Sequence, residues 1–106
     1  MKLAAIATAS LLALAGMPAM ADEAQLARGK ELFMTKAVPA CAVCHAMADA
    51  GSVGAIGPNL DELKPDAARI IKVLNEGMGA MPSFKATLSP ADMEAVAAYV
   101  VKSTSK

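Results

Sequence analysis

The strongest constraint on this chain is a five-residue motif, Cys-Ala-Val-Cys-His, at residues 41–45. It contains both cysteines and the only histidine of the 106 residues. A C-x-x-C-H motif is the signature of covalent haem attachment, in which each thiol adds across one vinyl group of the porphyrin. The adjacent imidazole then lies under the iron as a ligand. The motif therefore predicts one haem c, bound through Cys41 and Cys44, with His45 as an iron ligand.

Three other uses of these residues are weaker. A structural disulfide would pair the cysteines but give His45 no role. A thioredoxin-like redox pair needs a βαβ context, and the sequence shows none. A zinc site would need a fourth ligand, and the chain has no further cysteine or histidine. Haem attachment is the interpretation that uses all three side chains.

The first 21 residues read as a targeting segment. Residues 1–21 carry a single charge, Lys2, followed by an apolar run rich in Ala and Leu, and they end in Ala-Met-Ala. This order is typical of a secretory signal peptide. An uncleaved membrane anchor is the alternative, since the run could nearly span a bilayer, but Pro18 stands just before a good cleavage site. We expect cleavage after Ala21, export to the periplasm without stable membrane insertion, and one monohaem cytochrome c domain over residues 22–106.

Charge and composition narrow the function further. Loss of the signal peptide leaves nine basic against ten acidic residues, so nothing in the charge supports nucleic-acid binding. The chain has no tryptophan, two phenylalanines and one tyrosine. A domain of this size with few aromatic residues is only marginally stable by itself. A covalently held apolar cofactor would act as a staple.

The apolar pattern predicts an all-α fold with three main helices. The first covers residues 23–36, the second starts at Pro65 and stops at Gly77, and the third opens at Ser89. Residues 37–64 are expected to form a loop with a short helical piece around the cysteines, packed against the haem. No stretch alternates with period two, so we expect no sheet.

A second iron ligand must come from elsewhere in the chain. Five methionines follow the signal peptide: Met34, Met47, Met78, Met81 and Met93. The first and last of these fall in predicted helices and suit the core, and Met47 is too close to His45 to reach the opposite haem face. This leaves the two methionines of segment 77–84. A thioether is a good ligand for haem iron, although a methionine beside a haem can also be a gap filler.

Four features together resemble the class I bacterial c-type cytochromes, over nearly all of residues 22–106. They are the C-x-x-C-H motif, Gly-Pro-Asn-Leu at 57–60, Met-Pro at 81–82, and a helix pair with Gly29-x-x-x-Phe33 and Val96-x-x-Tyr99. The resemblance implies a small cytochrome c fold in which these two helices cross closely. It also implies that the carbonyl of Pro58 accepts a hydrogen bond from the ligand imidazole. Met81 is the implied axial ligand because proline follows Met81 and not Met78.

The resemblance implies a single-electron carrier rather than an enzyme, working with other redox proteins. Residues 61–66 and the Met-Pro-Ser-Phe sequence at 81–84 are similar to small cytochromes that take electrons from periplasmic sulfite dehydrogenases. This suggests a sulfite dehydrogenase as donor, and a terminal oxidase or another cytochrome as acceptor. Without a lysine excess, docking through a ring of lysines, as in mitochondrial cytochromes c, is not expected. The alternative function is a haem enzyme or gas sensor in which Met81 leaves the iron.

Overall fold

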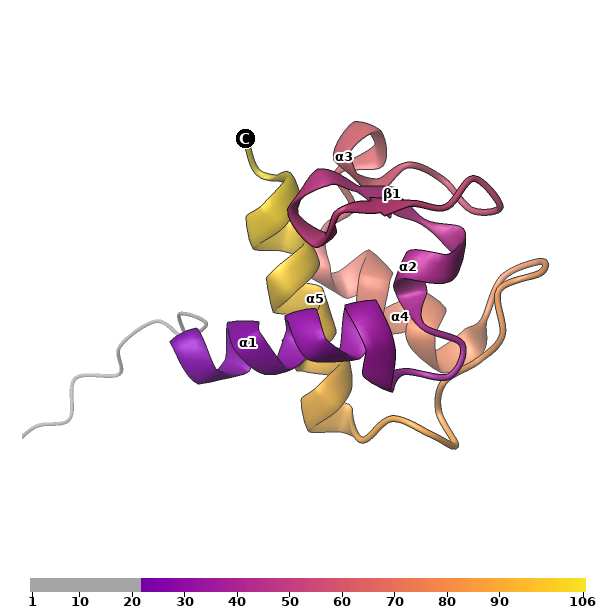
Figure 1. The fold of residues 1–106 in the computed structure, drawn as a ribbon. Coiled ribbons are helices and arrows are strands. Elements are labelled where there is room, and N and C mark those ends of the chain that lie inside the picture. The colour runs from indigo at the N-terminus through magenta and orange to yellow at the C-terminus, as the bar shows by residue number, and fades with distance from the viewer. Residues whose placement is uncertain (1–21) are drawn as a thin grey trace, which may run out of the picture.

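The structure, a computed structural model, describes residues 22–106, and the predicted signal peptide over residues 1–21 lies outside this part. Within residues 22–106, none of the helices combines the length and the apolar character that crossing a bilayer requires. The α-helices are α1 (Glu23–Glu31), α2 (Cys41–Cys44), α3 (Leu60–Leu63), α4 (Ala67–Glu76) and α5 (Pro90–Thr104), as Figure 1 shows. The predicted helical fold is confirmed, with α1, α4 and α5 as its three main helices.

Capping residues set where the main helices begin. The Asp66 side chain accepts a hydrogen bond from the backbone N–H of Arg69 at 2.8 Å, so α4 starts after Asp66 and not at Pro65 as predicted. Ser89 caps α5 in the same way, accepting from the N–H of Asp92 at 3.1 Å. At its C-terminal end, α1 widens into a π-helical turn, η1 (Leu32–Lys36), which completes the helical stretch predicted for residues 23–36.

The expectation that the chain has no sheet is wrong. Strand β1 (Ala46–Met47) pairs antiparallel with β2 (Ser52–Val53), and the 3-10 turn η2 (Ala48–Ala50) connects them. The Ser52 hydroxyl also accepts a hydrogen bond from the N–H of Met47 at 3.0 Å. Strands of two residues are too short to show a period-two pattern. This short β-hairpin connects α2 with the loop that leads to α3.

The first and last helices cross in close contact, as the resemblance implied (Figure 1). A Cβ atom on Gly29 would overlap the carbonyl oxygen of Ala95 and lie 2.7 Å from Cβ of Tyr99. Glycine inside a helix costs about 1 kcal/mol relative to alanine, and here it allows the two backbones to approach. Next to it, the buried rings of Phe33 and Tyr99 pack edge to face with centroids 5.8 Å apart.

A hydrogen bond joins this crossing to the segment after the cysteines. The Tyr99 hydroxyl donates to Oδ2 of Asp49 at 2.6 Å, and Nζ of Lys30 lies 3.5 Å from the same oxygen. The bond from Tyr99 lowers the pKa of Asp49, with a smaller contribution from Lys30. Burial and the Asp49 bond together raise the pKa of Tyr99. Helix α5 and the turn between β1 and β2 are thereby held in one arrangement.

Candidate haem-binding site

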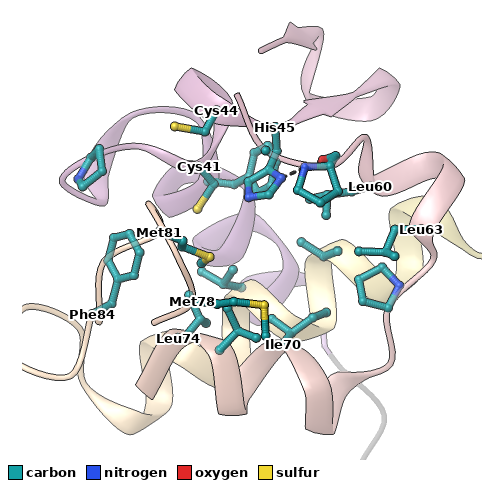
Figure 2. Close-up of a pocket in the computed structure, with 18 of the residues that line it drawn as sticks. Cys41, Cys44, His45, Leu60, Leu63, Ile70, Leu74, Met78, Met81 and Phe84 are labelled. Atoms are coloured by element: carbon teal, nitrogen blue, oxygen red, sulfur yellow. Dashed lines mark hydrogen bonds between the residues drawn. The ribbon is translucent and has the colours of Figure 1, made fainter. Parts of the chain in front are cut away.

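A cavity of about 320 Å³ lies between α2, the loop before α3, helix α4 and the loop before α5. Cys41, Cys44, His45 and Met81 all line it (Figure 2). Most of the remaining wall is apolar, and its larger side chains include Phe33, Leu60, Ile70, Val73, Leu74, Phe84, Val96 and Val100. The structure thus gathers the cysteine, histidine and methionine side chains singled out in the sequence around one apolar space.

The two cysteines belong to a single helical turn. In an α-helix residues three apart lie on the same side, so α2 places both cysteines along one wall of the cavity. The N–H of His45 closes this turn by donating to the carbonyl oxygen of Cys41 at 2.9 Å. Both cysteines are half-buried, and burial raises the pKa of the Cys41 thiol.

The imidazole of His45 is fixed by Pro58. Its Nδ1 lies 2.7 Å from the carbonyl oxygen of Pro58, and since a carbonyl can only accept, Nδ1 is the donor (Figure 2). In the neutral ring Nε2 then keeps its lone pair free. A second contact restricts the ring, because a Cβ on Gly57 would lie 2.5 Å from its Cε1 and 2.9 Å from Nδ1. Only glycine at residue 57 lets the imidazole lie flat against the backbone.

The two candidate methionines occupy the two arms of one tight turn. The N–H of Met78 donates to the carbonyl oxygen of Met81 at 3.0 Å, and the N–H of Met81 donates back to Met78 at 2.9 Å. Gly79, between them, has a φ of 57°, a left-handed conformation that glycine adopts without penalty. Both side chains line the cavity. They differ in burial, because Met78 is 66% exposed whereas Met81 packs against the hydrophobic core.

Helix α4 anchors this turn. The N–H of Phe84 donates to the carbonyl oxygen of Leu74 at 2.7 Å, and the Ser83 hydroxyl donates to that of Asn75 at 2.5 Å. Gly77 ends α4 with a φ of 72°, and a Cβ there would lie 2.8 Å from the carbonyl oxygen of Met81. The position of Met81 is therefore set by α4 and not only by its own loop.

The residues of this cavity fit a haem. Apolar walls suit a porphyrin, two thiols on one helical turn suit its two vinyl groups, and an imidazole and a thioether are the ligands of cytochrome c iron. Figure 2 shows the His45 ring on one side of the space and the Met81 sulfur on another. The carbonyl that orients His45 is the kind of outer partner that fixes a metal-binding imidazole.

Some residues of this wall were missed by the sequence analysis. Ile56, in the loop before Gly57, and Arg69, in the first turn of α4, both line the cavity. Neither belongs to a motif, so no sequence signal marked them. By contrast, Ile70 and Leu74 belong to the apolar stripe of the predicted second helix, and this stripe could have indicated the wall.

The helices and this cavity define the class of small cytochromes c, and comparison with known proteins agrees. Residues 24–100 match the family model described as cytochrome c oxidase, cbb3-type, subunit III. Cytochrome c6 of Synechocystis sp. is 38% identical over 91 residues, which cover 78% of this chain and 69% of the relative. The crystal structure of the c-type cytochrome SorU from Sinorhizobium meliloti matches with a TM-score of 0.76 at 47% identity, covering 80% of this chain and 97% of SorU.

The chain therefore belongs to the cytochrome c family. Membership implies haem c as the cofactor and supports the role of an electron carrier rather than an enzyme. The resemblance to bacterial c-type cytochromes noted in the sequence is confirmed.

Proposed function

We propose that the chain is an exported periplasmic electron carrier with one covalent haem c. Cys41 and Cys44 form the thioether bonds, and His45 and Met81 bind the iron. The observation that carries this proposal is the convergence of these four side chains on one apolar cavity. Two arguments support export. Residues 1–21 have the pattern of a signal peptide, and haem is attached to c-type cytochromes outside the bacterial cytoplasm.

The protein's own residues favour single-electron exchange. When bound, the haem supplies a one-electron couple, and a Met/His ligand pair raises its potential. The Pro58 carbonyl holds the His45 ring through Nδ1, so Nε2 is the nitrogen that would bind the iron, in a fixed tautomer. The hydrogen bonds from Phe84 and Ser83 to α4 hold Met81 in place. Mostly apolar side chains surround both ligands in the cavity.

Holoprotein purified from the periplasm tests this function directly. We expect one haem by intact mass, an N-terminus at Asp22, and a low-spin absorption spectrum with the weak near-infrared band of methionine-bound ferric iron. Such a protein should bind added carbon monoxide poorly. A high-spin spectrum with ready ligand binding would instead support the alternative class, a haem enzyme or gas sensor.

We further propose redox proteins as partners, with a sulfite dehydrogenase as donor and a terminal oxidase or another cytochrome as acceptor. The donor rests on the resemblance of residues 61–66 and 81–84 described above. The contact surface is expected beside the first cysteine and the methionine turn, where no residue is charged: Val38, Pro39, Ala40, Ala42, Gly79, Ala80 and Pro82. Of these residues Val38 is 77% exposed, and their neighbours in the sequence Val43 and Met78 are 60% and 66% exposed.

An uncharged contact surface predicts weak dependence of electron transfer on salt. Weak redox encounters bury little area, so a small apolar patch suffices. We expect the second-order rate of reduction by a sulfite dehydrogenase to fall less than about tenfold between low salt and about 0.2 M, where charges are screened beyond about 8 Å. Stopped-flow measurement of this rate against ionic strength checks the prediction. A fall of about a hundredfold or more would mean that charge steering dominates.

A further inference from the structure

Arg69 is the one Lys, Arg, Asp or Glu residue among the described residues that line the cavity. It is the third residue of α4, next to Ile70, whose side chain packs towards the core. Arg69 is itself exposed to solvent. A residue that lines a cavity and is also exposed lies at its rim. The Arg69 side chain therefore borders both the solvent and the apolar space.

Within residues 22–106, no acidic side chain forms an ion pair with Arg69. Three other cations there do have such partners: Arg28 with Asp92 and Glu31, Lys30 with Asp49, and Lys36 with Glu31. The carboxylate of Asp66 is close in the chain, but it accepts its hydrogen bond from the backbone N–H of Arg69 and not from the guanidinium.

Arg69 lies in the first turn of α4, where a positive charge is unfavourable. The N-terminal turn of a helix has a positive electrostatic potential, so a cation there is disfavoured by up to about 1 kcal/mol. The neighbouring cation Lys64 is already engaged, because its Nζ donates to the backbone carbonyls of Thr104 and Lys106 at 2.9 and 3.1 Å. Arg69 is thus a cation at the edge of the cavity with which no described acidic side chain forms an ion pair.

We propose that Arg69 binds the carboxylate groups that haem carries at its periphery. This inference rests on the proposed function and adds a role for a residue outside the haem-attachment motif. Haem has two propionate carboxylates, and the apolar cavity wall offers them no partner of opposite charge. A guanidinium group binds a carboxylate through two hydrogen bonds, and it loses its hydration water more easily than an ammonium group does. Both properties suit a site that is partly buried and partly exposed to water.

Such a pairing changes the reduction potential. The oxidised haem centre carries one more positive charge than the reduced centre, so unpaired carboxylates favour oxidation. A cation that neutralises them favours the reduced state. Replacing Arg69 by a neutral residue should therefore lower the potential. A neutral substitution elsewhere on α4 should have a much smaller effect.

The test measures reduction potentials of purified holoprotein at pH 7 for Arg69→Gln, Arg69→Leu and Arg69→Lys, with Lys72→Gln as the matched control. Lys72 is an exposed cation on the same helix and does not line the cavity. At a fixed electrode potential, we expect each neutral Arg69 variant to lower the ratio of reduced to oxidised protein about fivefold. This corresponds to about 40 mV for a one-electron couple. The control and Arg69→Lys should change the ratio less than twofold.

Equal shifts in Arg69→Gln and Lys72→Gln would overturn the inference, since they would show only the loss of one distant charge. A shift in Arg69→Lys as large as in Arg69→Gln would overturn it too, because the charge is kept. Haem content and absorption spectra of the same samples separate the two proposals. Wild-type protein without bound haem contradicts the proposed function, whereas full haem content with a potential insensitive to Arg69 contradicts this inference alone.

Discussion

Replacing both Cys41 and Cys44 by alanine should leave little stable holoprotein, while either single replacement should leave one thioether bond. The cavity that these cysteines line is bounded by α2, α4, part of α5 and the loops between them, and its apolar wall would otherwise face water. Apolar surface costs about 25 cal/mol per Å² when exposed. In a domain of this size, the free-energy cost of exposing this wall is comparable with the whole free energy of unfolding.

Covalent haem on denaturing gels and thermal unfolding by circular dichroism measure this outcome. Val43→Ala is the matched control, because Val43 lies between the two cysteines and is 60% exposed. Exposed substitutions usually change stability by less than about 0.5 kcal/mol, so this variant should keep its haem and its unfolding temperature. Cooperative unfolding of the double variant without haem would show that the fold does not depend on attachment.

Met81→Ala should convert the haem from low spin to high spin and open the iron to added carbon monoxide, whereas Met78→Ala should leave it low spin. The two side chains have the same chemistry and stand opposite each other in one turn. They differ in that Met81 packs on the core and Met78 is mostly exposed. Loss of the thioether ligand should also lower the reduction potential.

The absorption spectra of the two variants, with and without carbon monoxide, check this assignment. Met78→Ala removes an exposed side chain, so its free energy of unfolding should change by less than about 0.5 kcal/mol. A high-spin spectrum from Met78→Ala, with a low-spin spectrum from Met81→Ala, would exchange the roles of the two residues.

The parts of the site that depend on local sequence could be predicted. One helical turn fixes the relation between Cys41, Cys44 and His45, and this spacing is visible in the chain. The position of Pro58 next to the imidazole came from the resemblance, because nothing in residues 57–60 alone shows which side chain they meet. The structure explains it, since only a glycine at residue 57 lets that loop pass so close to the ring.

Features that depend on tertiary contacts could not be predicted. The pairing of β1 with β2 involves two residues in each strand, and a hydrogen bond from Met47 to Ser52 carries no periodic signal. The predicted start of α4 at Pro65 is too early: proline suits the first turn of a helix, but the Asp66 side chain caps α4, which therefore starts at Ala67. Arg69 has no sequence signal for a different reason: its place at the cavity and its lack of an acidic ion-pair partner within residues 22–106 both depend on the folded structure.

The crossing of α1 with α5 has a consequence for the order in which the molecule is completed. The surface that α1 needs is on the last helix of the chain, and Gly29 meets Ala95 and Tyr99 there. If the chain is exported as proposed, a polypeptide threaded across the membrane from its N-terminus cannot close this crossing until residue 99 has arrived. Up to that moment the turn at residues 41–45 lies in an open chain, accessible to a haem-attaching enzyme. Late closure of the terminal helices thus leaves an interval in which the cofactor can be joined before the cavity forms around it.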